Sequence, residues 1–182
     1  MGEIVLDALK ETLIMVFVST TFAVILGFIP AILLTVTAND GLKPNKIVYN
    51  ILDFIVNTLR SFPFVILMVI IVPLTRFIVG KSIGTTAAIV PLTIAAAPFV
   101  ARVIESSLRE GVIEAAKAFG ASNFQIIFKV MLKEAVPSIM SGITLTIISI
   151  VGYSAMAGAI GGGGLGDVAI RYGYQRFQTD VM

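Results

Sequence analysis

The sequence predicts an all-α integral membrane protein, and three observations lead to this fold class. Of the 182 residues, 57% are hydrophobic and only 13% are charged, whereas soluble domains are nearer a quarter charged. The mean hydropathy is +1.00. Several uncharged runs are also long enough, as helices, to cross the roughly 30 Å of hydrocarbon in a bilayer.

The composition also limits the chemistry of the chain. It contains no Cys and no His, so disulfides, thiolate chemistry and the commonest catalytic base and metal ligand are excluded. The net charge of +2 is small and its cations are scattered, which argues against a nucleic-acid partner. We therefore predict a protein that is not an enzyme and has no catalytic or metal site.

The first span is predicted at Leu13–Val36, because no residue from Thr12 to Asn39 is charged. A cleaved signal peptide is a poor alternative, since the apolar run is longer than a signal sequence requires. The acidic residues before it also fit a signal peptide poorly: Glu3, Asp7 and Glu11.

The second segment, Ile47–Val79, is predicted to be a helix interrupted near Pro63, because Arg60-Ser61-Phe62-Pro63 breaks its apolar pattern. Asp53 and Arg60 are seven residues apart and share one helix face.

The third span is expected between Lys81 and Arg102, where many small residues favour a central position in the packing. The fourth is expected from near Pro137 to about Ala159. The following Gly161–Gly164 run is predicted to be a tight turn outside the membrane. It does not read as a phosphate-binding loop, because no Lys-Ser/Thr follows it. These four spans are predicted to form a single transmembrane domain over residues 1–182.

The distribution of Lys and Arg favours an external N-terminus. With that orientation the cytoplasmic flanks carry Lys43, Lys46, Arg102, Arg109, Lys117, Lys129 and Lys133. The external flanks carry Lys10, Arg76, Lys81, Arg171 and Arg176. The segment Glu114–Pro137 is therefore expected in the cytoplasm.

This cytoplasmic segment reads as two short helices. Gly120 is placed to end the first with a positive φ, and Ser122 with Gln125 forms a capping box that begins the second. Helical spacing then predicts one apolar side formed by Phe124, Ile127, Phe128 and Met131. Such a segment is either a connector resting on the bundle or a docking element for another protein.

Its residues resemble the EAA loop of ABC importer permeases, whose pattern is E-A-A-x3-G-x9-I-x-L-P. Glu114-Ala115-Ala116, Gly120 and Leu132 match this pattern, Val130 replaces Ile and Lys133 replaces Pro. The stretches RSFPF (60–64), IVPLTIAAAPFVAR (89–102) and GYSAMAGAIGGGGLG (152–166) resemble methionine-importer permeases, so the similarity covers most of the chain.

The resemblance implies a type I ABC importer transmembrane bundle that imports methionine, with a fifth span after Met182. It implies a homodimer, two ATP-binding subunits, an external substrate-binding protein and the cytoplasmic membrane of a prokaryote. ATP and Mg would bind the partner ATPase, so no cofactor is expected in this chain. The coupling loop, at about residues 110–135, would contact the ATPase through Glu114, Ala115, Ala116, Gly120, Phe124, Ile127, Val130 and Leu132.

Five residues are candidates for the translocation path or a gate: Arg60, Pro63, Tyr153, Ser154 and Met156. An intramembrane charge such as Arg60 marks a functional position by default, although it can also pair with Asp53 or extend to an interface. Met156 is also a routine filler of a packed core. The rival functions are an importer of another amino acid or small solute, and a membrane scaffold or channel that needs no ATP.

The predicted topology can be tested with single cysteines, because the sequence contains none. We expect a membrane-impermeant thiol reagent to label Lys81→Cys in intact cells. Lys43→Cys and Ser122→Cys should be labelled only after permeabilisation. Labelling of Ser122→Cys from outside would contradict the orientation.

Overall fold

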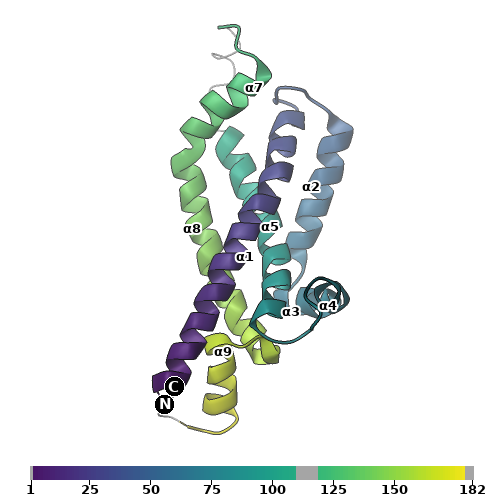
Figure 1. Cartoon of the computed structure of the whole chain (residues 1–182). Coiled ribbons are helices and arrows are strands. Elements are labelled where there is room, and N and C mark those ends of the chain that lie inside the picture. Colours follow the sequence, from purple (N-terminus) through teal and green to yellow (C-terminus); the bar gives the residue numbers. More distant parts are fainter. Residues whose placement is uncertain (1, 110–118, 179–182) are drawn as a thin grey trace. The chain divides into compact units, whose positions relative to one another are not determined.

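The computed structural model describes residues 2–109 and 119–178 (Figure 1). Within these ranges every regular element is helical, which confirms the predicted fold class. The elements are α1 (Gly2–Thr37), α2 (Lys46–Ser61), α3 (Phe64–Ile70), α4 (Val72–Val79), α5 (Thr85–Arg109), α7 (Asn123–Gln125), the π-helical turn η1 (Ile126–Met131), α8 (Leu132–Ala157), the turn η2 (Gly158–Gly162), α9 (Gly164–Val168) and the turn η3 (Ala169–Tyr174). Three predicted coupling residues, Glu114, Ala115 and Ala116, lie outside the described ranges.

The described helices include 3 that are long and apolar enough to cross a membrane: Gly2–Thr37, Thr85–Arg109 and Asn123–Gly162. The pair α2 and α3 makes a fourth if it is counted as one span, and it is bent by 106°. The bend falls at the predicted break, where Pro63 has the extended backbone angles φ −57° and ψ 132°. Proline has no N–H to continue the ladder of α2. The chain is therefore a multi-pass membrane protein.

The helix that contains the fourth span begins before Pro137, the residue near which the span was predicted to start. Pro137 lies inside α8, and the chain is helical from Asn123 through Ala157, before a kink at Ile160 and Gly161. A proline removes one backbone hydrogen bond, and a membrane helix tolerates this loss when nearby groups satisfy the freed carbonyl. Pro137 therefore does not begin the helix.

The structure forms two compact units. The first comprises Met1–Ala23, Ser61–Ala96 and Thr146–Met182, and the second comprises Val24–Arg60 and Ala97–Leu145. The description of residues 1–182 as a single transmembrane domain stays a prediction.

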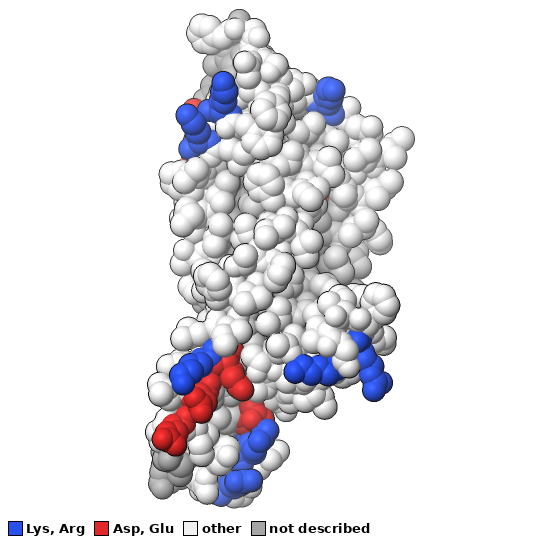
Figure 2. Space-filling model, in the orientation of Figure 1, with Lys and Arg blue, Asp and Glu red and all other residues white. Residues whose placement is uncertain are grey.

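The first unit joins the start of α1 to the glycine-rich turn before α9. The backbone N–H of Gly164 donates to the Glu11 carboxylate at 2.7 Å, and that of Leu165 donates to the Thr12 hydroxyl at 2.9 Å. Gly161, Gly163 and Gly164 have positive φ, which favours glycine. Acidic and basic side chains gather over this end of α1 and over α9 (Figure 2).

The second unit contains a close approach of α1 to α5. A Cβ added at Gly27 would lie 2.6 Å from the backbone oxygen of Ala97 and 3.0 Å from the nitrogen of Ala101. Small residues allow helix backbones to approach in this way. In the most apolar 18-residue stretch of α5, 56% is buried within the protein. The corresponding share is 39% in α1 and 28% in the helix that contains α8. The predicted packed position of the third span is confirmed.

Gly27→Ala should destabilise the protein, because the new methyl group would meet backbone atoms that cannot move aside. We expect a loss of about 1–3 kcal/mol in the free energy of unfolding. Gly152→Ala, also within a helix, is the matched control, since its Cβ would meet nothing within 4 Å. Thermal unfolding in detergent should show a lower midpoint for Gly27→Ala alone. Equal midpoints would contradict the close approach.

Candidate functional site

The structure describes the predicted coupling loop, at about residues 110–135, from Phe119 onward. We call this described part the coupling segment, and its backbone agrees with two predictions. Gly120 has a φ of +73°, as predicted for the residue that ends a helix. The Ser122 N–H donates to the Gln125 side chain at 2.9 Å, and the Gln125 N–H donates to the Ser122 hydroxyl at 3.4 Å. The predicted capping box is therefore present and fixes the start of α7.

Three phenylalanines of this segment are exposed: Phe119 by 91%, Phe124 by 67% and Phe128 by 43%. The rings of Phe124 and Phe128 are paired, with centroids 4.5 Å apart and an interplanar angle of 34°. We call these three residues the aromatic surface. Because this segment is predicted to lie in the cytoplasm, these exposed apolar groups fit a contact with another protein.

The residues predicted to line one apolar side differ in exposure: Phe124, Ile127, Phe128 and Met131. The buried residues here are Ile126 and Met131, while Phe124 and Phe128 face outward. The cause is η1, in which the Leu132 N–H donates to the Ile127 carbonyl, five residues back. A π-helical turn places residues five apart on one face. Of the other predicted coupling residues, Val130 and Leu132 are half-buried, as is Ile127.

Arg60 is exposed, and its guanidinium lies 5.8 Å from the centroid of the Phe99 ring. Its proposed pairing with Asp53 is wrong, because Asp53 pairs with Arg102 instead. Seven residues along α2 separate Arg60 from Asp53 by about 10 Å of helix. Arg102 of α5, by contrast, lies directly against Asp53.

The other candidates for the translocation path belong to the first unit. Pro63 is exposed at the bend, and Tyr153 stacks on Phe64 with ring centroids 4.8 Å apart. Ser154 is buried and donates to the Val151 carbonyl at 2.8 Å. Met156 is exposed by 46%, so the alternative that it fills the core of this chain is wrong. The roles of these residues in transport stay predictions.

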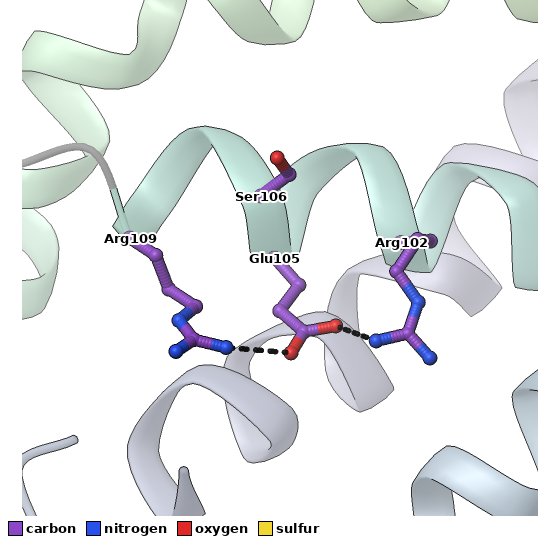
Figure 3. A pocket seen from close by; sticks show the side chains of 4 residues that line it. All are labelled: Arg102, Glu105, Ser106 and Arg109. Atoms are coloured by element: carbon purple, nitrogen blue, oxygen red, sulfur yellow. Dashed lines mark hydrogen bonds and ion pairs between the residues drawn. The ribbon is translucent and has the colours of Figure 1, made fainter. Parts of the chain in front are cut away.

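A polar cluster at the end of α5 was not predicted from the sequence, and Glu105 is its centre (Figure 3). The Glu105 side chain is only 2% exposed. Its carboxylate accepts from Arg102 at 2.7 Å and from the Tyr49 hydroxyl at 3.2 Å, and the Arg109 guanidinium lies 3.8 Å away.

Two arginines extend this cluster to other elements. Arg102 also donates to Asp53 and to Asn57, both on α2. Arg109 donates to Asp40, in the turn after α1, at 2.8 Å. This hydrogen bond holds the pKa of the Asp40 carboxyl below its ordinary value.

A cavity of about 380 Å³ is lined by Arg102, Glu105, Ser106 and Arg109. The sequence signal for this cluster was the spacing of Arg102, Glu105 and Arg109, which places all three on one helix face. The predicted end of the third span at Arg102 hid it, because α5 continues to Arg109. Among residues 2–109 and 119–178, no group of three or more His, Cys, Asp or Glu side chains is arranged to hold a metal ion.

Comparison with known proteins defines the class. Residues 23–180 match the family described as binding-protein-dependent transport system inner membrane component, and the chain belongs to this family. The probable D-methionine transport system permease protein MetI of Vibrio cholerae is 50% identical over 184 residues, which cover 100% of this chain and 82% of that protein. The D-methionine transport system permease protein MetI of Escherichia coli K12 is 50% identical over 151 residues, covering 81% and 70%.

Solved structures agree with this assignment. An inward-facing structure of the MetNI methionine ABC transporter matches with a TM-score of 0.92 and 49% identity, over 95% of this chain and 82% of the other. An amino acid ABC transporter solved with histidines matches with a TM-score of 0.75 at 20% identity, over 97% and 82%. The second likeness shows the fold alone. The predicted type I importer permease fold is confirmed.

Gly120→Val should disturb the aromatic surface without unfolding the spans. A β-branched residue at positive φ costs about 1–2 kcal/mol, whereas a Cβ at Gly120 would meet nothing within 4 Å. Gly120→Asn is the matched control, since Asn tolerates this backbone region. In pull-downs with a cognate ATP-binding subunit, we expect Gly120→Val to bind less well than Gly120→Asn. Equal binding by both variants and the wild type would show that the segment is only a connector.

Proposed function

We propose that this chain is the permease subunit of an ATP-driven importer that carries methionine across the cytoplasmic membrane of a prokaryote by alternating access. The observation that carries this proposal is the identity of about one residue in two, over the full length of the chain, with a relative named as a probable D-methionine transport permease. Similarity confined to the coupling loop would support only the wider class, because that loop occurs in importers of many solutes.

The same proposal assigns ATP hydrolysis to a separate subunit, which binds ATP and Mg. Two features support this assignment. The Gly161–Gly164 run is not followed by Lys-Ser/Thr, and the Gly164 and Leu165 N–H groups beside it already donate to Glu11 and Thr12. A phosphate-binding loop needs such groups free to face the phosphates.

The aromatic surface supports a mechanical role for the segment that carries it. Phe124 and Phe128 lie at and just after a capped helix start, and Phe119 directly precedes the positive-φ Gly120. An exposed apolar helix face of this kind can bind in a hydrophobic groove of another protein. We assign it to the contact with the ATPase, together with the predicted coupling residues Glu114, Ala115 and Ala116.

The complete importer would contain two copies of this chain, two ATP-binding subunits and an external substrate-binding protein. The family description, which refers to binding-protein-dependent transport, supports the last of these. The solute is proposed to be D-methionine, L-methionine or both. An importer of another amino acid or small solute is the alternative.

Uptake by a permease-deleted strain tests this proposal. The chain is expressed with a candidate ATPase and binding protein, and accumulation of labelled methionine is measured. We expect uptake that requires the ATPase and is competed by unlabelled methionine, since an apolar, flexible solute suits helices that are rich in Ala, Thr and Met. Competition by a basic or acidic amino acid, but not by methionine, would favour the alternative solute.

A further inference from the structure

Within the second unit, α5 is bound to α8 on one face. The Ser107 hydroxyl donates to the Ser138 hydroxyl at 2.9 Å, and Ser107 is only 4% exposed. A Cβ added at Gly142 of α8 would overlap the side chain of Val103, which lies one turn before Ser107 on α5. Val103 and Ser107 are four residues apart, so a single face of α5 carries both contacts.

Another face of α5 is bound to α2. Arg102 donates to Asp53 and Asn57, and Tyr49 of α2 donates to Glu105. Tyr49, Asp53 and Asn57 recur every four residues and form one stripe along α2. Glu105 fixes the geometry of this face, because it accepts from Arg102 and from Tyr49 with almost no access to water.

The helix that contains α8 also carries part of the aromatic surface. It runs from Asn123 to Gly162, so Phe124, Phe128 and Ser138 lie on one continuous helix. Ser138 contacts Ser107 of α5, and α5 contacts α2 through Arg102 and Glu105, so the contacts connect this helix to α2.

We propose that Ser138, Ser107, Glu105, Arg102 and Asp53 form a polar relay that couples movement of the aromatic surface to α2. This inference rests on the proposed function, in which that surface contacts an ATPase. Glu105 is a positioning residue in the relay. Its buried charge must keep its hydrogen-bonding partners, so α2 and α5 move together rather than separating.

The two ends of the relay are the places to test it, because a variant of the buried Glu105 is at risk of not folding. Asp53→Asn removes the charge on α2, and Asp53→Glu restores it. Ser138→Ala removes the hydroxyl on α8. The matched controls are Asp7→Asn, at an exposed salt bridge in the first unit, and Ser141→Ala, whose hydroxyl donates to the Pro137 carbonyl of its own helix.

The assay uses the complete importer, with its ATPase and binding protein, reconstituted in vesicles. ATP hydrolysis, methionine uptake, subunit assembly and thermal unfolding are measured for each variant. We expect Asp53→Asn and Ser138→Ala to assemble and unfold as the wild type does, but to transport about fivefold fewer methionines per ATP, within the usual range of coupling between sites. Asp53→Glu and both controls should retain the wild-type ratio.

An unchanged ratio of transport to ATP hydrolysis in Asp53→Asn and Ser138→Ala would overturn the relay. A parallel loss of both activities with a lower unfolding midpoint would also overturn it, because the contacts would then serve stability alone. These results differ from a failure of the proposed function. In that case the wild-type importer itself would show no ATP-dependent methionine uptake, and the proposed relay would be rejected together with the proposed function.

Discussion

The burial of the Glu105 carboxylate is the constraint from which the second unit is best understood. An ionised carboxylate removed from water is costly unless it is paired and hydrogen-bonded. Glu105 meets this requirement with Arg102, Arg109 and Tyr49.

The requirement also orients α2. Its stripe of Tyr49, Asp53 and Asn57 contacts α5, which leaves large apolar side chains exposed on other sides of the helix: Ile47, Ile51, Phe54 and Ile55. In a bilayer, lipid can cover those side chains, so the contacts of the stripe with Glu105 and Arg102 account for the polar face of α2 within a membrane protein.

In the first unit the groups that need partners are backbone N–H groups, and side chains supply the acceptors. A chain that turns sharply after a membrane helix leaves N–H groups without partners. Here Glu11 and Thr12, which lie 153 residues away in the sequence, accept from the two N–H groups at the start of α9. The glycines allow this approach, since a Cβ at Gly164 would lie 2.6 Å from the Thr12 hydroxyl oxygen. In both units, polar groups in an apolar fold are satisfied by partners that are distant in sequence.

That distance explains what could be predicted from the sequence. The spans, the break at Pro63, the positive φ of Gly120 and the Ser122–Gln125 capping box depend on neighbouring residues, and all were predicted. The Arg102–Asp53 and Glu105–Tyr49 contacts depend on how two helices meet, so the sequence alone suggested the wrong partner, Arg60. The start of α8 and the face formed by Ile126 and Met131 were missed for another reason. Both depend on whether a helix continues through a proline or widens into a π-helical turn, and packing around the helix decides this more than local propensity does.

The π-helical turn η1 also explains why the coupling segment is structured rather than a short loop. An α-helical continuation from Ser122 would place Phe124, Ile127, Phe128 and Met131 on one side, and burying that side would hide the phenylalanines. The wider turn buries Ile126 and Met131 instead, which anchors the segment while Phe124 and Phe128 stay outside. A buried phenylalanine contributes about 1.5–3 kcal/mol relative to an exposed one, and this gain is forgone in the isolated chain. The segment thus exposes three phenylalanines, two of them on a capped and anchored helix, and this arrangement gives up stability in the single chain. Under the proposed function, the ATPase would recover that stability by covering the aromatic surface.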